Sequence, residues 1–357
     1  MSNSVRAVLS LVFLCTPLGF SQQAAAPAAN AAAQTPTQAV APTRTSLDVL
    51  VTDKAGKPVP DLEPMDFSLL DNGQPRKILS FRRTNGIAGN SFDPPVQVIF
   101  VLDAVNMNYR VDNLVRQQLG RFLRQNGGRL AQPTSLFILT SKGLQVQPVP
   151  SRDGNALADV AEKATGLMRA EGSASDLEGQ EDMFRKSLNA LAGIAENEAR
   201  VPGRKMIVWL GPGWSLLNDV RIVETKESRQ GYFRLILSMS AKLREARITL
   251  YCIFPVAGII SQGMYESFLK PIVDPHKAAP GNLCLPVLAR QSGGRVIDAS
   301  NDVAGQLADC IGDIGTYYTI SFAAPAAVAA NEYHDLKVVV AQPGLASRTS
   351  SGYYNQP

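Results

Sequence analysis

The sequence predicts an α/β protein in which a doubly wound, mostly parallel sheet is inserted in a small β-sandwich formed from the N- and C-terminal segments. Short apolar runs alternate with helical stripes between residues 95 and 315, a pattern typical of parallel sheets covered by helices. Period-two patterns occur before and after that region. Each terminal segment has too few strands to be stable alone, so we expect the two segments to share one sandwich.

The first 45 residues are expected to precede the folded part. Arg6 lies before a short apolar stretch, and the small residues Gly19 and Ser21 flank a cleavage site. This pattern is typical of a secretory signal peptide, residues 1–21, and the stretch is too short to span a membrane. Residues 22–45, rich in Ala, Pro, Gln and Thr, are expected to form a linker. We therefore expect a secreted or periplasmic protein without a transmembrane segment after signal cleavage.

Residues 46–88 are expected to form the N-terminal part of the β-sandwich. Apolar residues alternate over 47–51, and Asn72-Gly73 separates two strand-like runs. An Asn-Gly pair between such runs predicts a tight hairpin.

Residues 95–315 are expected to form the α/β domain. The predicted strands are the apolar runs at 96–102, 135–140, 205–210, 248–254 and 294–297, and the predicted helices carry stripes over 111–123, 184–195, 233–243 and 303–314. Runs without alternation indicate strands that are buried on both faces. From residue 316 to 357 the period returns to two, which predicts the strands that complete the sandwich.

Composition and charge narrow the function classes. The 357 residues include 45% hydrophobic and 18% charged residues, and the formal net charge is +4. This is globular composition. Lys and Arg never gather into a basic run, so we expect no nucleic-acid partner.

The cysteines permit at most one disulfide after signal cleavage. Cys252 lies in an apolar strand and is expected to be a buried thiol. Cys284 and Cys310 lie on predicted helices on either side of the 294–297 strand. In an oxidising compartment they are the candidate pair for a disulfide, and the alternative is that both stay free.

The sequence lacks the motifs that are typical of catalytic and cofactor-binding sites. The turn after the first α/β strand, residues 103–109, contains no glycine, whereas phosphate-binding turns need Gly-rich backbone. The chain has no G-x-S-x-G elbow, and its two histidines, His276 and His334, lie far apart in sequence. We expect no enzyme and no cofactor.

Together these motifs resemble the VWFA-related domain family of bacterial secreted proteins. The resemblance runs from Leu47 to Tyr354 and rests on "LDVLVTDKAGKPVPDLEPMDFSLLDNGQPRKILSF", "VIFVLD", "YYTISF", "YHDLKVVVAQPG" and the terminal "GYY". It implies a von Willebrand factor A fold, which often carries a metal-ion-dependent adhesion site with the pattern D-x-S-x-S after the first strand. Asp103 matches the Asp, but Val105 and Met107 occupy the serine positions.

The resemblance therefore implies a degenerate metal site. Mg²⁺ requires hard oxygen ligands, which valine and methionine lack. The loop at 211–213 reads Gly-Pro-Gly, without an acid. If a cation such as Mg²⁺ bound at all, its ligands would come from Asp103, Asn106, Ser173, Ser175 and Asp176. Otherwise the Asp103 carboxylate is expected to accept backbone N–H groups in the following turn or to pair with an Arg.

The sequence thus predicts an exported, non-catalytic module that binds a protein partner through the loops 103–109, 172–178 and 211–219 at the carboxyl ends of the strands, called the crown below. Aromatic residues are enriched at interface hot spots, and Trp214 is expected either there or packed under its own loop. The alternatives are an envelope scaffold that binds through the β-sandwich, and a metal-dependent hydrolase. The expected partner-binding rim consists of Asp103, Asn106, Tyr109, Trp214, Ser215 and Asp219.

Overall fold

The computed structural model describes residues 44–147, 149–164, 177–214, 225–255, 265–300 and 302–355. The predicted signal peptide and nearly all of the predicted linker lie outside these ranges. Among the helices in these ranges, none combines the length and the apolar character that crossing a bilayer requires.

The central sheet is mostly parallel. In the described residues its strands follow the order β11-β10-β9-β5-β6-β7, and β8 pairs with β6. The first five strands in that order run parallel to one another, whereas β7 and β8 are antiparallel to β6. The strands are β5 (Gln97–Asp103), β6 (Arg129–Thr140), β7 (Gly143–Val146), β8 (Ser151–Asp153), β9 (Lys205–Leu210), β10 (Ile248–Ile253) and β11 (Val296–Ile297).

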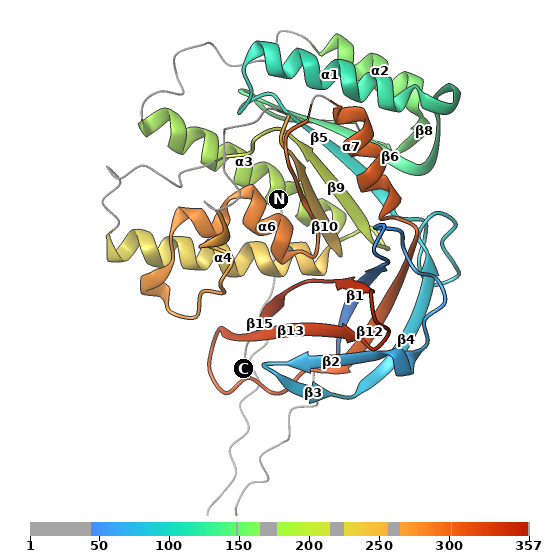
Figure 1. The fold of residues 1–357 in the computed structure, drawn as a ribbon. Helices are drawn as coiled ribbons and strands as arrows, with labels where there is room; N and C mark the ends of the chain where they lie inside the picture. The colour runs from blue at the N-terminus through green and yellow to red at the C-terminus, as the bar shows by residue number, and fades with distance from the viewer. Residues whose placement is uncertain are drawn as a thin grey trace, which may run out of the picture. The chain divides into compact units, whose positions relative to one another are not determined.

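Helices cover both faces of this sheet (Figure 1). Helices α1 (Tyr109–Leu123), α2 (Gly154–Lys163) and α7 (Val303–Gly312) pack against the face that carries Val98 and Phe100 of β5. Helices α3 (Leu177–Glu198), α4 (Lys226–Glu245) and α6 (Leu285–Gln291) pack against the face that carries Ile99 and Val101. Successive side chains of a strand point to opposite faces, so β5 contributes to both cores. The predicted α/β arrangement is confirmed.

The two ends of the chain form two antiparallel sheets, with the strand orders β14-β1-β12-β4 and β15-β13-β2-β3. N-terminal β1 pairs with C-terminal β12 and β14, and β2 pairs with β13. Apolar side chains of both sheets share one core, which includes Val49, Leu69, Ile320 and Val338. Two antiparallel sheets with a common core are compatible with the expected shared sandwich. Its strands are β1 (Arg44–Thr52), β2 (Phe67–Asp71), β3 (Gln74–Arg76), β4 (Ile78–Asn85), β12 (Thr316–Ala323), β13 (Glu332–Val340), β14 (Ala346–Arg348) and β15 (Gly352–Asn355).

The structure refines several boundaries. Strand β1 begins at Arg44, two residues before the predicted start of the sandwich, because its backbone continues to pair with Ala323 of β12. The predicted hairpin forms between β2 and β3, where Asn72 and Gly73 adopt positive φ angles of 51° and 75°. Strand β4 then leaves this sheet and pairs with β12.

Candidate functional site

The candidate site lies where β5 and β9 end at the carboxyl edge of the central sheet, the edge at which doubly wound sheets bind ligands. Asp103 is the last residue of β5 and is 0% exposed. Its neighbour Leu102 pairs with Leu210, the last residue of β9. The loops at 104–108 and 211–214 therefore surround the Asp103 carboxylate.

N–H donors occupy the Asp103 carboxylate. The backbone N–H of Asn106 donates to Oδ1 at 3.1 Å, and the Asn106 side-chain Nδ2 lies 2.9 and 2.8 Å from the two carboxylate oxygens. The indole Nε1 of Trp209 donates to Oδ2 at 2.8 Å. Of the two arrangements expected for Asp103, acceptance of a backbone N–H is observed, and an indole and an amide are its other donors among the described residues.

Burial dominates the electrostatics of this carboxylate. It raises the pKa of Asp103 to about 6, and the hydrogen bonds from Trp209 and Asn106 oppose that rise. A carboxylate removed from water without a cation loses solvation that neutral donors replace only in part.

The loop after Asp103 is apolar where an adhesion site needs oxygen atoms. Val105 and Met107 are 5% and 7% exposed and belong to the cores on opposite faces of the sheet. Asn108 caps α1, because its side chain accepts a hydrogen bond from the backbone N–H of Val111. The local sequence thus builds a tight turn into a helix.

The loop after β9 closes over Asp103. Gly211 has a φ of +147°, and a Cβ placed there would lie 2.8 Å from the Asp103 Cβ. Trp214 is 1% exposed, donates from Nε1 to the Leu283 carbonyl at 2.9 Å, and packs edge-on against Trp209 with ring centroids 5.4 Å apart. Hence, in the part of this loop that the structure describes, backbone and indole rings lie beside the carboxylate.

The described donors do not fit a divalent cation. Each Asp103 oxygen already accepts N–H groups, from Asn106 and from Trp209. Mg²⁺ needs several oxygen ligands and retains waters. In the ranges that the structure covers, no group of three or more His, Cys, Asp or Glu side chains is arranged to hold a metal ion. Ser173, Ser175 and Asp176 lie outside the described residues.

The predicted rim is only partly at the surface. Tyr109 is 61% exposed, and Asn106 is partly buried. Asp103 and Trp214 are buried, so neither can contact a partner directly; of the two positions expected for Trp214, it occupies the packed one. Ser215 and Asp219 lie outside the described residues.

The cysteines depart from the expected disulfide. Cys252, Cys284 and Cys310 are all buried free thiols. Cys284 packs with Tyr265 and Val287, whereas Cys310 belongs to the core on the α1 and α7 face. Because the two side chains are held in separate apolar clusters, they do not form a bridge. Burial also raises the pKa of each of these two thiols to about 12, which keeps them protonated and unreactive.

The histidines supply no catalytic pair. His334 Nδ1 lies 2.7 Å from the Asp71 Oδ1, and its ring stacks on Tyr353 with centroids 4.9 Å apart. Both His334 and Asp71 are buried within the sandwich, so a substrate cannot reach them. His276 is exposed in the short 3-10 helix Pro275–Lys277, where its backbone carbonyl accepts a hydrogen bond from Arg229.

Two residues of the site were missed by sequence reasoning. From the sequence, Trp209 is predicted only as part of the apolar strand at 205–210. Ser187 lies within the predicted helix at 184–195, and the sequence indicates no role for it. In the structure the Asn106 Nδ2 lies 2.9 Å from the Ser187 hydroxyl oxygen, which ties α3 to the loop. The available signal was a tryptophan in an otherwise aliphatic strand, because a buried indole N–H needs an acceptor.

Comparison with known proteins assigns no family. No protein-family model matches the chain, and no curated protein matches it. The crystal structure of the human COPII-coat protein Sec24c is similar with a TM-score of 0.32 and 10% sequence identity, over 77% of this chain and 46% of that chain. This chain thus spans less than half of that solved structure, and a likeness at this level says nothing about shared activity.

Proposed function

We propose that the chain is an exported, non-catalytic protein-interaction module of von Willebrand factor A type, with a degenerate adhesion site. Three features support this proposal. The sequence motifs occur in the order of the VWFA-related family, a mostly parallel sheet lies between two terminal β segments, and the described polar clusters lack an accessible acid–base pair. The hydrogen bonds from Trp209 and Asn106 to Asp103 carry the proposal, because they occupy the carboxylate that a cation would need.

Direct binding of cations tests the degenerate site. Equilibrium dialysis with Mg²⁺ and Mn²⁺ is expected to show no stoichiometric binding to the native chain. The comparison variant is Asp103→Ala, which removes the buried carboxylate at the end of β5. Stoichiometric binding by the native chain that disappears in this variant would contradict the proposal, because it would show that the N–H donors yield to a metal.

The exposed part of the crown is the expected docking surface. Tyr109 begins α1 and is 61% exposed beside the partly buried Asn106. An aromatic ring at the edge of a polar loop presents apolar area at a small cost in conformational entropy. Recognition would then depend on shape and side-chain contact, with Asp103 acting through the conformation of the 104–108 loop.

An envelope scaffold that binds through the β-sandwich remains the second candidate. The most exposed large apolar side chains among the described residues, Val328 at 92% and Met65 at 89%, belong to the terminal β segments. They are separated in sequence, and single apolar residues at a surface are common, so this observation favours the scaffold less strongly than the crown.

A photo-crosslinking side chain placed at position 109 or at position 328 distinguishes the two candidates. In the native cell envelope, position 109 is expected to give one defined protein adduct. That adduct should then bind the purified chain saturably and lose affinity in Tyr109→Ala. An adduct formed from position 328 alone, with binding unchanged in Tyr109→Ala, would instead support the scaffold.

A further inference from the structure

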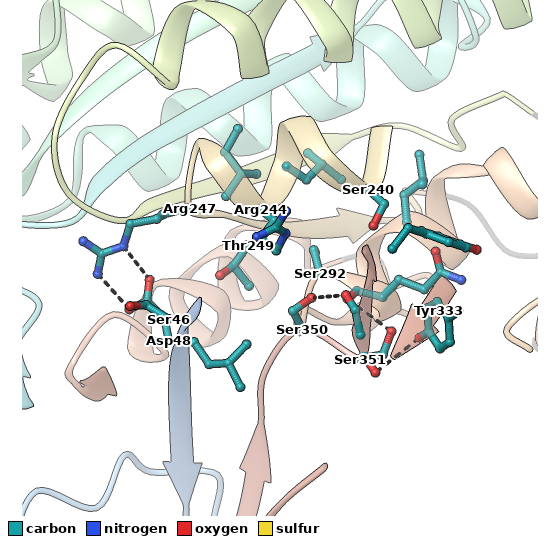
Figure 2. Close-up of a pocket in the computed structure, with 17 residues that line it drawn as sticks. Ser46, Asp48, Ser240, Arg244, Arg247, Thr249, Ser292, Tyr333, Ser350 and Ser351 are labelled. Carbon is teal, nitrogen blue, oxygen red and sulfur yellow. Dashed lines mark hydrogen bonds and ion pairs between the residues drawn. The ribbon is translucent and has the colours of Figure 1, made fainter. Parts of the chain in front are cut away.

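A cavity of about 90 Å³ lies between the sandwich and the α/β region. Strand β1, helices α4 and α6, and the segment that leads into β15 line it. Figure 2 shows Arg244 of α4 near the middle of this cavity, with Ser240 from the same helix and Ser292, Ser350 and Ser351 from other elements around it. Charged and hydroxyl side chains therefore converge from both parts of the fold.

The guanidinium of Arg244 carries a positive charge that no carboxylate among the described residues neutralises. No carboxylate within the described ranges pairs with it, and its Nε atom is buried without a hydrogen-bond partner. Its guanidinium lies 5.8 Å from the centre of the Tyr353 ring, which orients it by a cation–π contact. The ring in turn stacks on His334. The guanidinium is thus held in place while donors remain available.

The other charges on the cavity wall are already paired. Arg247 makes a two-pronged ion pair with Asp48, at 2.9 Å from Nε and 2.7 Å from Nη2 (Figure 2). A second carboxylate, Asp93, lies 2.5 Å from Arg247 Nη1. The unpaired charge that lines the cavity is therefore the positive charge of Arg244.

Hydroxyl groups supply further donors on the cavity wall. The side chains of Ser46 and Ser240 make no hydrogen bond to the part of the chain that the structure describes. Ser350 makes only a long bond of 3.3 Å to the Gly352 carbonyl. A hydroxyl can donate or accept, so these groups can turn toward an anion.

The cavity has room for a small ligand. One water needs about 10–15 Å³ of space of this kind, so the 90 Å³ accommodate a small anion. A guanidinium binds carboxylates and phosphates through two parallel N–H bonds. We infer that the cavity binds a small oxyanion, either a carboxylate or a tetrahedral phosphate, with Arg244 as its principal partner and Ser240 and Ser46 as supporting donors. This inference does not rest on the proposed function.

Isothermal titration at constant ionic strength, with acetate and with inorganic phosphate as separate probes, tests the site. Saturable binding of at least one probe is expected. Arg244→Gln should weaken it about tenfold to a hundredfold, the usual effect of losing a charge-assisted hydrogen bond. Arg244→Lys, which keeps the charge and loses the fork, should weaken it less. The matched control is Arg234→Gln on the exposed face of the same helix, which should bind as the native chain does.

The two probes also separate the two ligand classes. Binding of acetate alone assigns a carboxylate, and binding of phosphate alone assigns a tetrahedral oxyanion. No saturable binding of either probe, or equal weakening in the Arg234 and Arg244 variants, would overturn the inference. Circular dichroism of each variant excludes unfolding, and Ser240→Ala provides a milder change with a smaller expected loss of affinity.

Discussion

At the scale of single residues, Asp103 acts as the acceptor that organises the crown. Its carboxylate holds the turn through the Asn106 backbone and side chain, and it fixes the Trp209 indole in the core. The acidic residue at the end of the first α/β strand therefore has a structural task. Among the described residues the donors to this buried carboxylate are neutral N–H groups, and this has consequences that can be measured.

The first prediction concerns the pH dependence of stability. Burial raises the pKa of Asp103 from 3.8 in the unfolded chain to about 6 in the folded one. Between these values the folded state binds more protons, so its stability from this group is fully present below about pH 4 and is lost as pH rises through 6. The loss is about 3 kcal/mol, at 1.36 kcal/mol per pKa unit.

Urea unfolding of the native chain and of Asp103→Asn, at several pH values between 4 and 7.5, measures this effect. The native chain is expected to lose stability relative to the variant as pH rises, because the amide does not titrate. In the variant an amide NH₂ group faces the N–H donors of Trp209 and Asn106, which changes its absolute stability. The decisive quantity is therefore the slope of the free energy of unfolding against pH. Parallel curves for the two proteins would show that Asp103 does not titrate in this range.

The second prediction uses the two neighbouring indoles. Trp209→Phe removes a donor to the carboxylate, so the pKa of Asp103 should rise further and stability at pH 7 should fall by about 1–3 kcal/mol beyond the loss of packing. At pH 4 the loss should be smaller, because the carboxyl group is then protonated. Trp214→Phe is the matched control, since its indole binds the neutral Leu283 carbonyl and its loss should be equal at both pH values.

Residue roles at this site were only partly accessible from the sequence. The mismatch at Val105 and Met107 is visible in the chain itself and correctly places apolar atoms beside Asp103. The donor from Trp209 is not visible, because it depends on β5 and β9 being neighbours. The burial of Trp214 likewise follows from its contact with Leu283, far along the chain.

At the scale of elements, the loop after β9 depends on the absence of a side chain at Gly211. Its φ of +147° is a conformation that other residues rarely adopt, and an added Cβ would lie 2.8 Å from the Asp103 Cβ. The Gly-Pro-Gly sequence thus lets the loop approach the end of β5 closely. A loop with an acid in this place would need a different backbone path.

Gly211→Ala is therefore expected to lower the free energy of unfolding by about 2–4 kcal/mol, from backbone strain and overpacking together. Gly193→Ala is the matched comparison, because Gly193 lies inside α3 and an added Cβ there meets no atom within 4 Å. That change should raise the free energy of unfolding by about 0.5–1 kcal/mol. Urea unfolding of both variants measures the difference, and a neutral Gly211→Ala would mean that the loop can move away from Asp103.

Strands with a continuous apolar sequence were predictable, whereas strands with a mixed sequence were not. The apolar runs at 205–210 and 248–254 correspond to β9 and β10, where every strand residue is buried. Strands β7 and β8 carry partly exposed, polar sequences, and their formation depends on pairing with β6. Strand β11 is shorter than the predicted strand at 294–297: it keeps only Val296 and Ile297, the two residues that pair with β10.

At the scale of the whole folded unit, ion pairs join the sandwich to the α/β region. Arg247, just after α4, binds Asp48 of β1 and Asp93 of the segment before β5. Asp93 also binds Arg82 of β4 at 2.6 Å, and Arg348 of β14 binds Asp313 after α7 at 2.6 Å. Shared strands made the insertion predictable from the sequence, but these charges lie too far apart along the chain to be paired by inspection.

The last prediction follows from the burial of these charges. The Asp48 and Asp93 side chains are 13% and 2% exposed, and Arg247 is 30% exposed. Arg247→Met keeps the apolar stem, but it removes the cation that pairs with Asp48 and leaves Asp93 with Arg82 alone among the described residues. Because an uncompensated buried charge is strongly unfavourable, the free energy of unfolding should fall by about 3–5 kcal/mol.

Arg124→Met breaks ion pairs to Asp159 and Glu162 that lie in solvent, and it should leave the urea midpoint nearly unchanged. A restored midpoint in Arg247→Met combined with Asp48→Asn would assign the loss to the unpaired carboxylate. Equal losses in the Arg247 and Arg124 variants would show that water reaches this junction freely, and the ion pairs would then not be what holds the two parts together.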